Sequence, residues 1–195
     1  MDGILTTNSK QLLLPIRIIA TVVRGFGRGS KDLGIPTANL DRSTMSSSTP
    51  FDDLPTGIYW GYAKIGSNNN NKNIDDTDDN DTTTTTTEIY KSAISIGYNP
   101  TYGNTEKTVE PHFIAPSHDP RRHASKTGET LLHDFYDQTC RLSVVGYLRP
   151  ELPFEGIEKL VEAIKNDITN TEMLSDSTEQ IPLGEKAWVK SDESL

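Results

Sequence analysis

Residues 15–40 read PIRIIATVVRGFGRGSKDLGIPTANL, and this stretch decides how the start of the chain folds. Residues 15–24 are dense in isoleucine and valine, which favours a well-buried β-strand. The residues that follow combine glycines with cations and end in Pro-Thr-Ala-Asn, so a strand is predicted to open into a loop whose free N–H groups can wrap an anion. A plain tight turn is the alternative. The glycine spacing matches neither G-x-x-x-x-G-K-[ST] nor G-x-G-x-x-G, so any phosphate loop is of another kind.

The overall charge limits the classes of partner that the protein is expected to bind. The chain has 195 residues and a formal net charge of -9, which argues against general binding to nucleic acid or to an anionic membrane. Its single cysteine, Cys140, excludes an internal disulfide. No apolar run is long enough for a membrane span, and no cleaved signal is evident. We expect a cytoplasmic protein, with a mitochondrial pool as the alternative.

The rest of the chain indicates an antiparallel β domain. Alternating or β-branched patterns predict further strands at 57–65, 88–97, 105–114 and 135–148. The low-complexity residues 66–87 have almost nothing to bury, so we interpret them as a disordered hairpin tip, and residues 115–133 as a second polar insertion. Because strands do not alternate with helices, we expect an antiparallel sheet that closes into a small barrel.

One late helix is predicted from an apolar stripe. The stripe consists of Ile157, Leu160, Val161, Ile164 and Ile168. Pro153 and two glutamates suit the start of that helix. We divide the chain into a flexible start (1–14), one domain (15–170) and an acidic, weakly patterned tail (171–195). Docking of Trp188 back onto the domain is the alternative for this tail.

Two groups of polar residues are candidates for phosphoryl chemistry. Thr37 and Asn39 alternate across Ala38, so in an extended segment their oxygens point to the same side and could hold Mg²⁺ if a nucleotide supplied the negative charge. Glu110 could act as a general base toward an alcohol, although a solvated strand carboxylate is the more frequent role. His112 is interpreted as a nucleotide-facing or internally satisfied side chain. The histidines have no spacing that indicates zinc.

A further group lies just before the helix. Arg149 and Phe154 could form one wall of an apolar pocket for a planar ligand. An ordinary salt bridge between Arg149 and a carboxylate is the default alternative.

Taken together, these segments resemble riboflavin kinase (flavokinase) of the eukaryotic, monofunctional kind. The resemblance rests on VVRGFGRGSKDLGIPTANL (22–40), TGIYWGYA (56–63), SIGYNPTYGNTEKTVEPHF (95–113), DFY (134–136) and VVGYLRPELPFEGIEKLVEAIKNDI (144–168). It implies a mainly β fold, a six-stranded antiparallel Greek-key β-barrel with a flanking C-terminal α-helix. It also implies transfer of the ATP γ-phosphoryl group to the ribityl 5′-hydroxyl of riboflavin, which gives FMN and ADP.

The resemblance also implies roles for particular residues. Glu110 would be the catalytic base, and Thr37 and Asn39 would bind the metal, for which Mg²⁺ is expected and Zn²⁺ is an alternative. The nucleotide would contact Gly25, Lys31, Thr37, His112 and Tyr136, and the flavin would contact Arg149, Glu151 and Phe154. We expect a monomer whose ligands are riboflavin or FMN and ATP or ADP.

The sequence departs from the family pattern in two places. Asp137 follows DFY where glycine is common, and the insertion at 115–133 lengthens a loop that is short in relatives. The chain has no room for the adenylyltransferase domain of bacterial relatives, so FAD synthesis is not expected. The alternative functions are a non-catalytic flavin-binding barrel and an oligonucleotide-binding barrel, and the acidic charge opposes the second.

Overall fold

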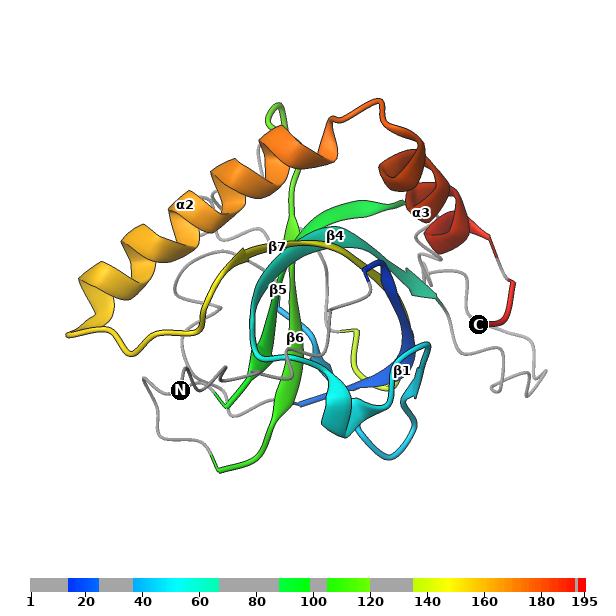
Figure 1. Ribbon diagram of the computed structural model, residues 1–195, viewed down its shortest axis with the longest axis horizontal. Coiled ribbons are helices and arrows are strands. Elements are labelled where there is room, and N and C mark those ends of the chain that lie inside the picture. The colour runs from blue at the N-terminus through cyan, green and yellow to red at the C-terminus, as the bar shows by residue number, and fades with distance from the viewer. Residues whose placement is uncertain (1–13, 25–36, 67–87, 99–104, 120–134, 192) are drawn as a thin grey trace, which may run out of the picture.

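The structure is a computed structural model that describes residues 14–24, 37–66, 88–98, 105–119, 135–191 and 193–195. Five long strands form most of it (Figure 1). They are β1 (Ile16–Val23), β4 (Gly57–Gly66), β5 (Tyr90–Gly97), β6 (Thr108–Ile114) and β7 (Thr139–Arg149). Shorter elements are β2 (Asn39–Leu40), β3 (Ser46–Ser47) and the 3₁₀ turn η1 (Phe51–Asp53), and two helices follow, α2 (Ile157–Ser175) and α3 (Gln180–Lys190).

The strands form an antiparallel barrel that is almost closed. Their order is β2-β1-β7-β4-β5-β6, with β3 paired to β1, and every ladder is antiparallel. The ring is completed where Thr37 bridges His112 of β6 and the N–H of Ala38 donates to the carbonyl of Pro111 at 3.0 Å. The predicted barrel is therefore confirmed. Closure joins the segment before β2 to the strand that carries Glu110.

The core explains why these residues form strands. Along β1, alternate residues from Ile16 to Val22 point inward and are buried, as the β-branched pattern predicts. Aromatic side chains fill the centre, and Phe113 packs edge-on against both Tyr90 and Phe135. The segment between β2 and β4 contains β3 and η1. Residues 67–87 of the first insertion and 120–133 of the second lie outside the described part of the chain.

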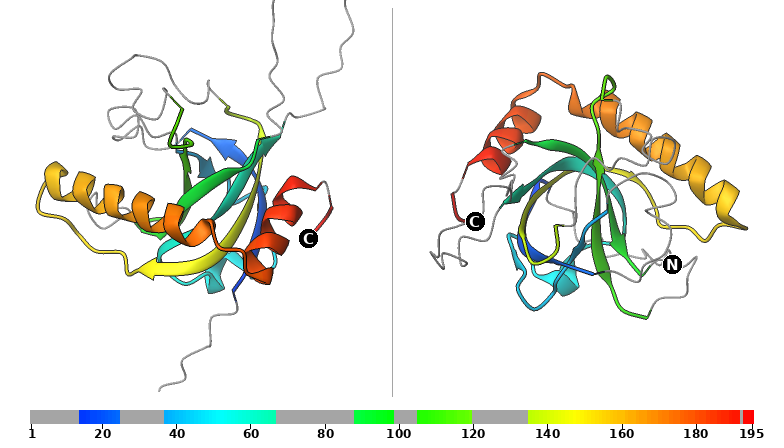
Figure 2. Two further views of the ribbon diagram at one scale, coloured as in Figure 1. Left: turned by 90° about the horizontal axis from the view of Figure 1, so that it is seen from above. Right: turned by 180° about the vertical axis from the view of Figure 1, so that it is seen from behind.

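Helix α2 crosses the outside of the barrel over β4 and β5 (Figures 1 and 2). Its buried side chains are Asp167, Thr171 and Ser175, whereas Ile157 of the predicted stripe is 57% exposed. The other four residues of the stripe are partly buried and lie on the same side of the helix as Asp167, Thr171 and Ser175, so the stripe follows the packing face and only its first residue is exposed. Pro153 also lies before the helix, which begins after Gly156. No helix in the described ranges is long and apolar enough to span a membrane.

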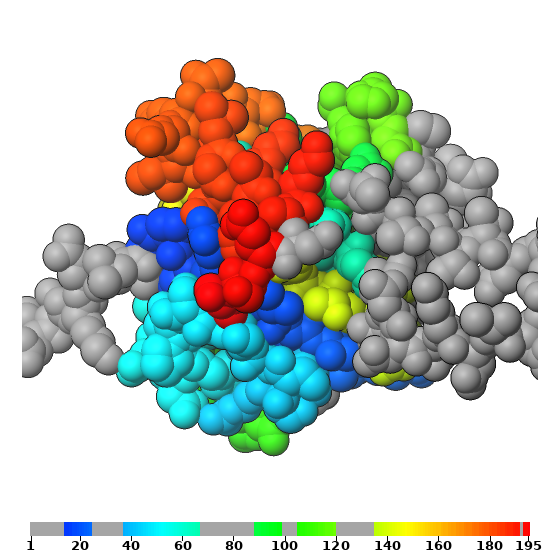
Figure 3. All heavy atoms as spheres, turned by 90° about the vertical axis from the view of Figure 1, so that its right-hand side faces the viewer, coloured from blue at the N-terminus to red at the C-terminus, as the bar shows by residue number. Residues whose placement is uncertain are grey.

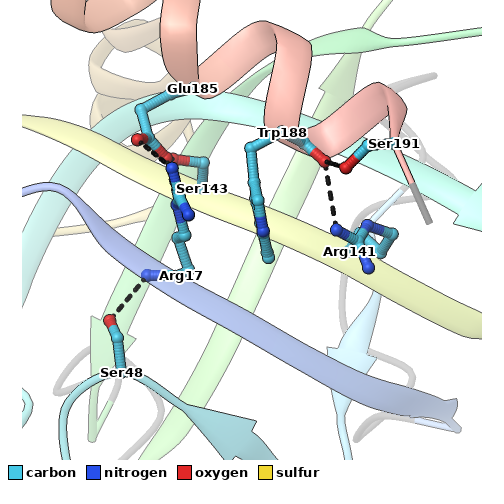
Figure 4. A network of polar contacts seen from close by, with 7 residues as sticks. All are labelled: Arg17, Ser48, Arg141, Ser143, Glu185, Trp188 and Ser191. Atoms are coloured by element: carbon cyan, nitrogen blue, oxygen red, sulfur yellow. Dashed lines mark hydrogen bonds and ion pairs between the residues drawn. The ribbon is translucent and has the colours of Figure 1, made fainter. Parts of the chain in front are cut away.

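The segment after residue 170, for which the sequence predicts an acidic tail, is largely helical. Helix α2 continues to Ser175, and α3 packs against β4 and β7. Figure 3 shows this C-terminal segment seated against the side of the barrel. Trp188 is only 3% exposed, because its ring lies between the guanidinium groups of Arg17 and Arg141, whose central carbons are 4.8 Å and 4.3 Å from the ring centroid (Figure 4).

Polar contacts complete the docking of α3. Glu185 accepts two hydrogen bonds from Arg17, at 2.9 Å and 3.0 Å, and one from Ser143 at 2.7 Å (Figure 4). Arg141 donates to the carbonyl of Trp188 at 3.0 Å. The periodicity of a short amphipathic segment does not reveal partners that lie 42 to 168 residues away, so the sequence alone did not establish this docking.

Candidate active site

The closure of the barrel brings two candidate groups together. Thr37 Oγ1 lies 3.1 Å from Nδ1 of His112, and Glu110 is two residues away on the same face of β6. Ala38 is fully buried, whereas Thr37 and Asn39 are only partly buried. The side chains of Thr37 and Asn39 thus belong to the side of the segment opposite to Ala38, which agrees with the predicted alternation.

Glu110 lies in an environment that suits a base. Burial raises the pKa of its carboxyl, the hydrogen bond from Thr108 opposes that rise, and the negative charge of Glu151 adds to it. Thr108 Oγ1 donates to Glu110 Oε1 at 2.8 Å. A carboxylate with a raised pKa accepts a proton more readily than an ordinary solvated one.

His112 is electrically neutral near pH 7. Burial lowers its pKa to about 4, since no carboxylate compensates for the loss of solvent around the ring. Its Nδ1 is within hydrogen-bond distance of the Thr37 hydroxyl. His112 is therefore suited to orient Thr37 and does not supply a positive charge to a phosphate.

Glu151 lies against the end of β5. The N–H of Tyr98 donates to Glu151 Oε2 at 3.0 Å. A β-carbon at Gly97 would overlap the same carboxylate, so the absence of a side chain there is what allows the close approach. Glu151 consequently lies near Glu110, although the two are 41 positions apart in the sequence.

Arg149 contacts both helix α2 and Phe154. Its Nε and Nη2 donate to Asp167 of α2 at 2.9 Å and 2.7 Å. Its guanidinium carbon lies 5.4 Å from the centroid of the Phe154 ring. The salt bridge that was the default alternative is therefore present, and its partner is the buried Asp167, which the sequence did not indicate.

Of the remaining predicted nucleotide residues, the structure describes Tyr136. Tyr136 is 37% exposed, and Arg24 lies over its ring at 5.3 Å from the centroid. Gly25 and Lys31 lie outside the described residues. Among the residues that the structure describes, no group of three His, Cys, Asp or Glu side chains could hold a metal ion.

Comparison with known proteins identifies the family. The family model described as Flavokinase, riboflavin kinase, matches residues 12–175. The chain belongs to the riboflavin kinase family. Riboflavin kinase from Mus musculus is 36% identical over 170 residues, which covers 87% of each protein. Riboflavin kinase from Neosartorya fischeri is 44% identical over 162 residues, 78% of this chain and 73% of the relative.

A solved structure supports the same fold. The crystal structure of riboflavin kinase from Trypanosoma brucei aligns with a TM-score of 0.54 over 93% of this chain and 89% of that one. The sequence identity is 22%, so this likeness is evidence for the riboflavin kinase fold alone.

Asp137, the residue that departs from the expected glycine after DFY, has a backbone conformation that favours glycine. Its φ is 62°, in the left-handed region that aspartate tolerates better than most residues. The N–H of Asp137 donates to the carbonyl of Val22, and the N–H of Val22 donates to the carbonyl of Gln138, each at 2.9 Å. The departure from the family pattern therefore leaves the turn after Tyr136 tied to β1.

The donor set fits a hard divalent cation of the kind the riboflavin kinase family requires. Thr37 and Asn39 offer neutral oxygens, which suit Mg²⁺ when nucleotide phosphates supply the charge. Sequence reasoning missed Thr108 and Asp167, which hold Glu110 and Arg149. The sequence could have indicated Thr108 as a partner of Glu110, because residues two apart on a strand share one face. No nearby residue in the sequence indicated that Asp167 would pair with Arg149.

Proposed function

We propose that this riboflavin kinase family member transfers the γ-phosphoryl group of ATP to the ribityl 5′-hydroxyl of riboflavin beside Glu110. The reaction takes place at the barrel seam, which we define as the place where Thr37 and Ala38 pair with Pro111 and His112. The products are FMN and ADP. The observation that carries the proposal is the closure of the barrel, because it brings the Thr37–Asn39 segment to the strand that presents Glu110. Family membership supplies the reaction class, and the seam supplies residues suited to it.

Glu110 acts as the general base in this proposal. It accepts the proton of the 5′-hydroxyl as the hydroxyl oxygen attacks the γ-phosphorus, while the bond from that phosphorus to the β,γ-bridging oxygen breaks. Its raised pKa, caused first by burial, favours this proton transfer. Positioning of the reacting groups supplies most of the acceleration in phosphoryl transfer, and a rigid strand is well suited to it.

Thr37 and Asn39 hold the divalent cation, for which we propose Mg²⁺. When bound, such a cation neutralises the charge that develops on the phosphates. His112 fixes the hydroxyl of Thr37, and it remains neutral because its pKa is about 4. Gly25 and Lys31 line the nucleotide in this proposal, and Tyr136 lies beside it.

The flavin contacts the segment before α2. We assign the planar ligand to Phe154, and we assign Arg149 the task of fixing Phe154 and α2 through its bond to Asp167. The chain acts as a monomer in the cytoplasm in this proposal.

The test is an incubation of the purified protein with riboflavin, ATP and Mg²⁺, followed by chromatography for FMN and ADP. We expect FMN and ADP in equal amounts, and neither product when ATP or the metal is omitted. Riboflavin binding without FMN under any divalent metal would identify a non-catalytic flavin-binding barrel and overturn the proposal. Replacing Mg²⁺ with Zn²⁺ in a parallel series identifies the working metal.

A further inference from the structure

The carboxylate of Glu110 is held by Thr108 of the same strand, and the hydroxyl of Thr108 also reaches the neighbouring strand. Thr108 Oγ1 lies 2.8 Å from Glu110 Oε1 and 3.3 Å from the carbonyl oxygen of Gly97, at the end of β5. Thr108 and Glu110 are two residues apart on β6, so their side chains share one face of the strand. The hydroxyl of Thr108 therefore joins the carboxylate to the backbone of the next strand.

A hydroxyl has one proton, and here it has two acceptors within reach. While Glu110 is ionised, the shorter and charge-assisted bond to Oε1 is favoured. Once Glu110 has taken up a proton, the Thr108 hydroxyl can instead donate to the Gly97 carbonyl. Thr108 is thus never left unpaired as the charge on Glu110 changes, and its bond to Oε1 leaves Oε2 to receive a proton.

A second carboxylate is fixed at the same strand end. Glu151 accepts the N–H of Tyr98 at 3.0 Å and occupies the space that a β-carbon of Gly97 would fill. Gly97 and Tyr98 consequently anchor both the Thr108 hydroxyl and the Glu151 carboxylate. The negative charge of Glu151 acts on Glu110 from this position.

We infer that Thr108 and Glu151 are positioning residues for the base: Thr108 orients the Glu110 carboxylate, and Glu151 holds a negative charge beside it that strengthens it as a proton acceptor. The inference rests on the proposed role of Glu110. It gives Glu151 a task on the base, in place of the flavin contact that the family resemblance implies.

The other ionisable groups near this strand end are accounted for. His112 follows Glu110 on β6 and is neutral, with a pKa of about 4. Lys107 donates to the backbone carbonyls of Phe51 and Leu54, and Arg149 donates to Asp167. Among the described residues, Glu151 is therefore the charged group that acts on Glu110.

The two residues have opposite effects on Glu110, which makes the test specific. Thr108 lowers the pKa of Glu110 and Glu151 raises it. Since the base works in its ionised form, activity falls as the pH falls through that pKa. Thr108→Val should move the acid limb of the kcat/KM profile for riboflavin to higher pH, and Glu151→Gln should move it to lower pH.

The first measurement is therefore the pH profile of wild type, Thr108→Val, Thr108→Ser and Glu151→Gln at saturating ATP and Mg²⁺. The protonation of ATP affects all four pH profiles equally, so a difference between two profiles comes from the protein. We expect kcat of Thr108→Val to fall about tenfold, since a hydrogen bond to a charged group is lost, with Thr108→Ser near wild type. Thr108→Ala replaces Thr108→Val if the latter fails to fold.

The matched control is Glu155→Gln, which removes one glutamate charge from the same connecting segment. Glu155 is exposed and pairs with Lys159 at 2.8 Å, so its loss should leave the acid limb unchanged. Shifts of both variants in the same direction, or unshifted limbs in both, would overturn the inference.

A second measurement does not depend on activity. The carboxyl signals of ¹³C-labelled glutamate side chains are titrated by NMR, and the Glu110 signal is assigned by its absence in Glu110→Gln. We expect the Glu110 midpoint to rise in Thr108→Val and to fall in Glu151→Gln. If wild type forms no FMN, the proposed function fails while this titration still decides how Glu110 is held. Unchanged midpoints in an active enzyme would reject the positioning roles alone.

Discussion

At the scale of single residues, the environment of Glu110 distinguishes it from an ordinary, solvated carboxylate on a strand. It is partly buried, accepts a hydrogen bond from Thr108 and has a raised pKa. Glu110→Gln keeps the shape of the side chain but cannot accept the proton. We expect turnover to fall by about 10²- to 10⁴-fold, the usual contribution of a general base, with ATP binding little changed. FMN formation and nucleotide titration measure the two effects.

The matched control is Glu106→Gln, which alters an exposed carboxylate shortly before the same strand. Its activity should equal that of wild type. If Glu110→Gln retained full turnover, another group would have to be the base.

At the scale of elements, α2 is attached to the barrel by polar contacts. Asp167, on its buried face, accepts two hydrogen bonds from Arg149, and the hydroxyl of Tyr62 donates to the carbonyl of Ser175 at 2.8 Å. Asp167→Ala leaves the guanidinium without this partner. We expect the free energy of unfolding to fall by about 3 kcal/mol, the lower end for breaking a buried pair, because Arg149 keeps some solvent exposure. Urea denaturation measures the change.

Lys159→Gln is the control on the same helix, since it breaks the exposed pair with Glu155. Such pairs contribute only about 0.3–0.5 kcal/mol. Equal losses in the two variants would show that the Asp167 contact does not anchor α2.

At the scale of the whole molecule, α3 attaches the C-terminal end of the chain to two strands of the barrel, β1 and β7. Trp188→Ala removes the ring that lies between Arg17 and Arg141, and should destabilise the fold by about 3–5 kcal/mol.

Cys140 is the single cysteine and is fully buried in β7, where burial raises its pKa to about 12. Its reaction with a thiol reagent therefore reports opening of the barrel, and should accelerate by about 100-fold or more in Trp188→Ala.

Leu183→Ala, on the exposed face of α3, provides the comparison and should label at the wild-type rate. Unaltered labelling in Trp188→Ala would mean that the docking of α3 adds nothing to global stability.

The low-complexity insertion is also a property of the whole chain, because it joins β4 to β5. These strands pair from Gly57 to Ala63 with Ile96 to Tyr90, so the hairpin is held by its own ladder. Residues 68–86 contain almost no apolar side chains to bury. We predict that deleting them leaves FMN formation and the melting temperature near those of the full chain. A Gly-Ser linker of equal length is the control, and a large loss with both changes would show that the insertion has a function.

Short-range patterns predicted much of this protein correctly. The strands of the barrel follow from β-branched and alternating residues, and the alternation of Thr37 and Asn39 put their oxygens on one side, because side-chain direction along a strand has a period of two. The strand and side-chain patterns depend on residues close together in the chain. Recognition of the family added the six-stranded topology and the substrates, and it turned Glu110 from one possible base into the expected catalytic base.

Only the tertiary structure decided the features that join distant residues. The seam between Thr37 and His112, the bond of Arg149 to Asp167 and the docking of Trp188 each link separate elements. The predicted stripe on α2 marks the packing face of the helix, but the sequence did not indicate the polar contact at the centre of that face, where Asp167 pairs with Arg149 of the barrel. The pKa of Glu110 likewise depends on burial and on a carboxylate 41 positions away, since electrostatic interactions follow distance in space.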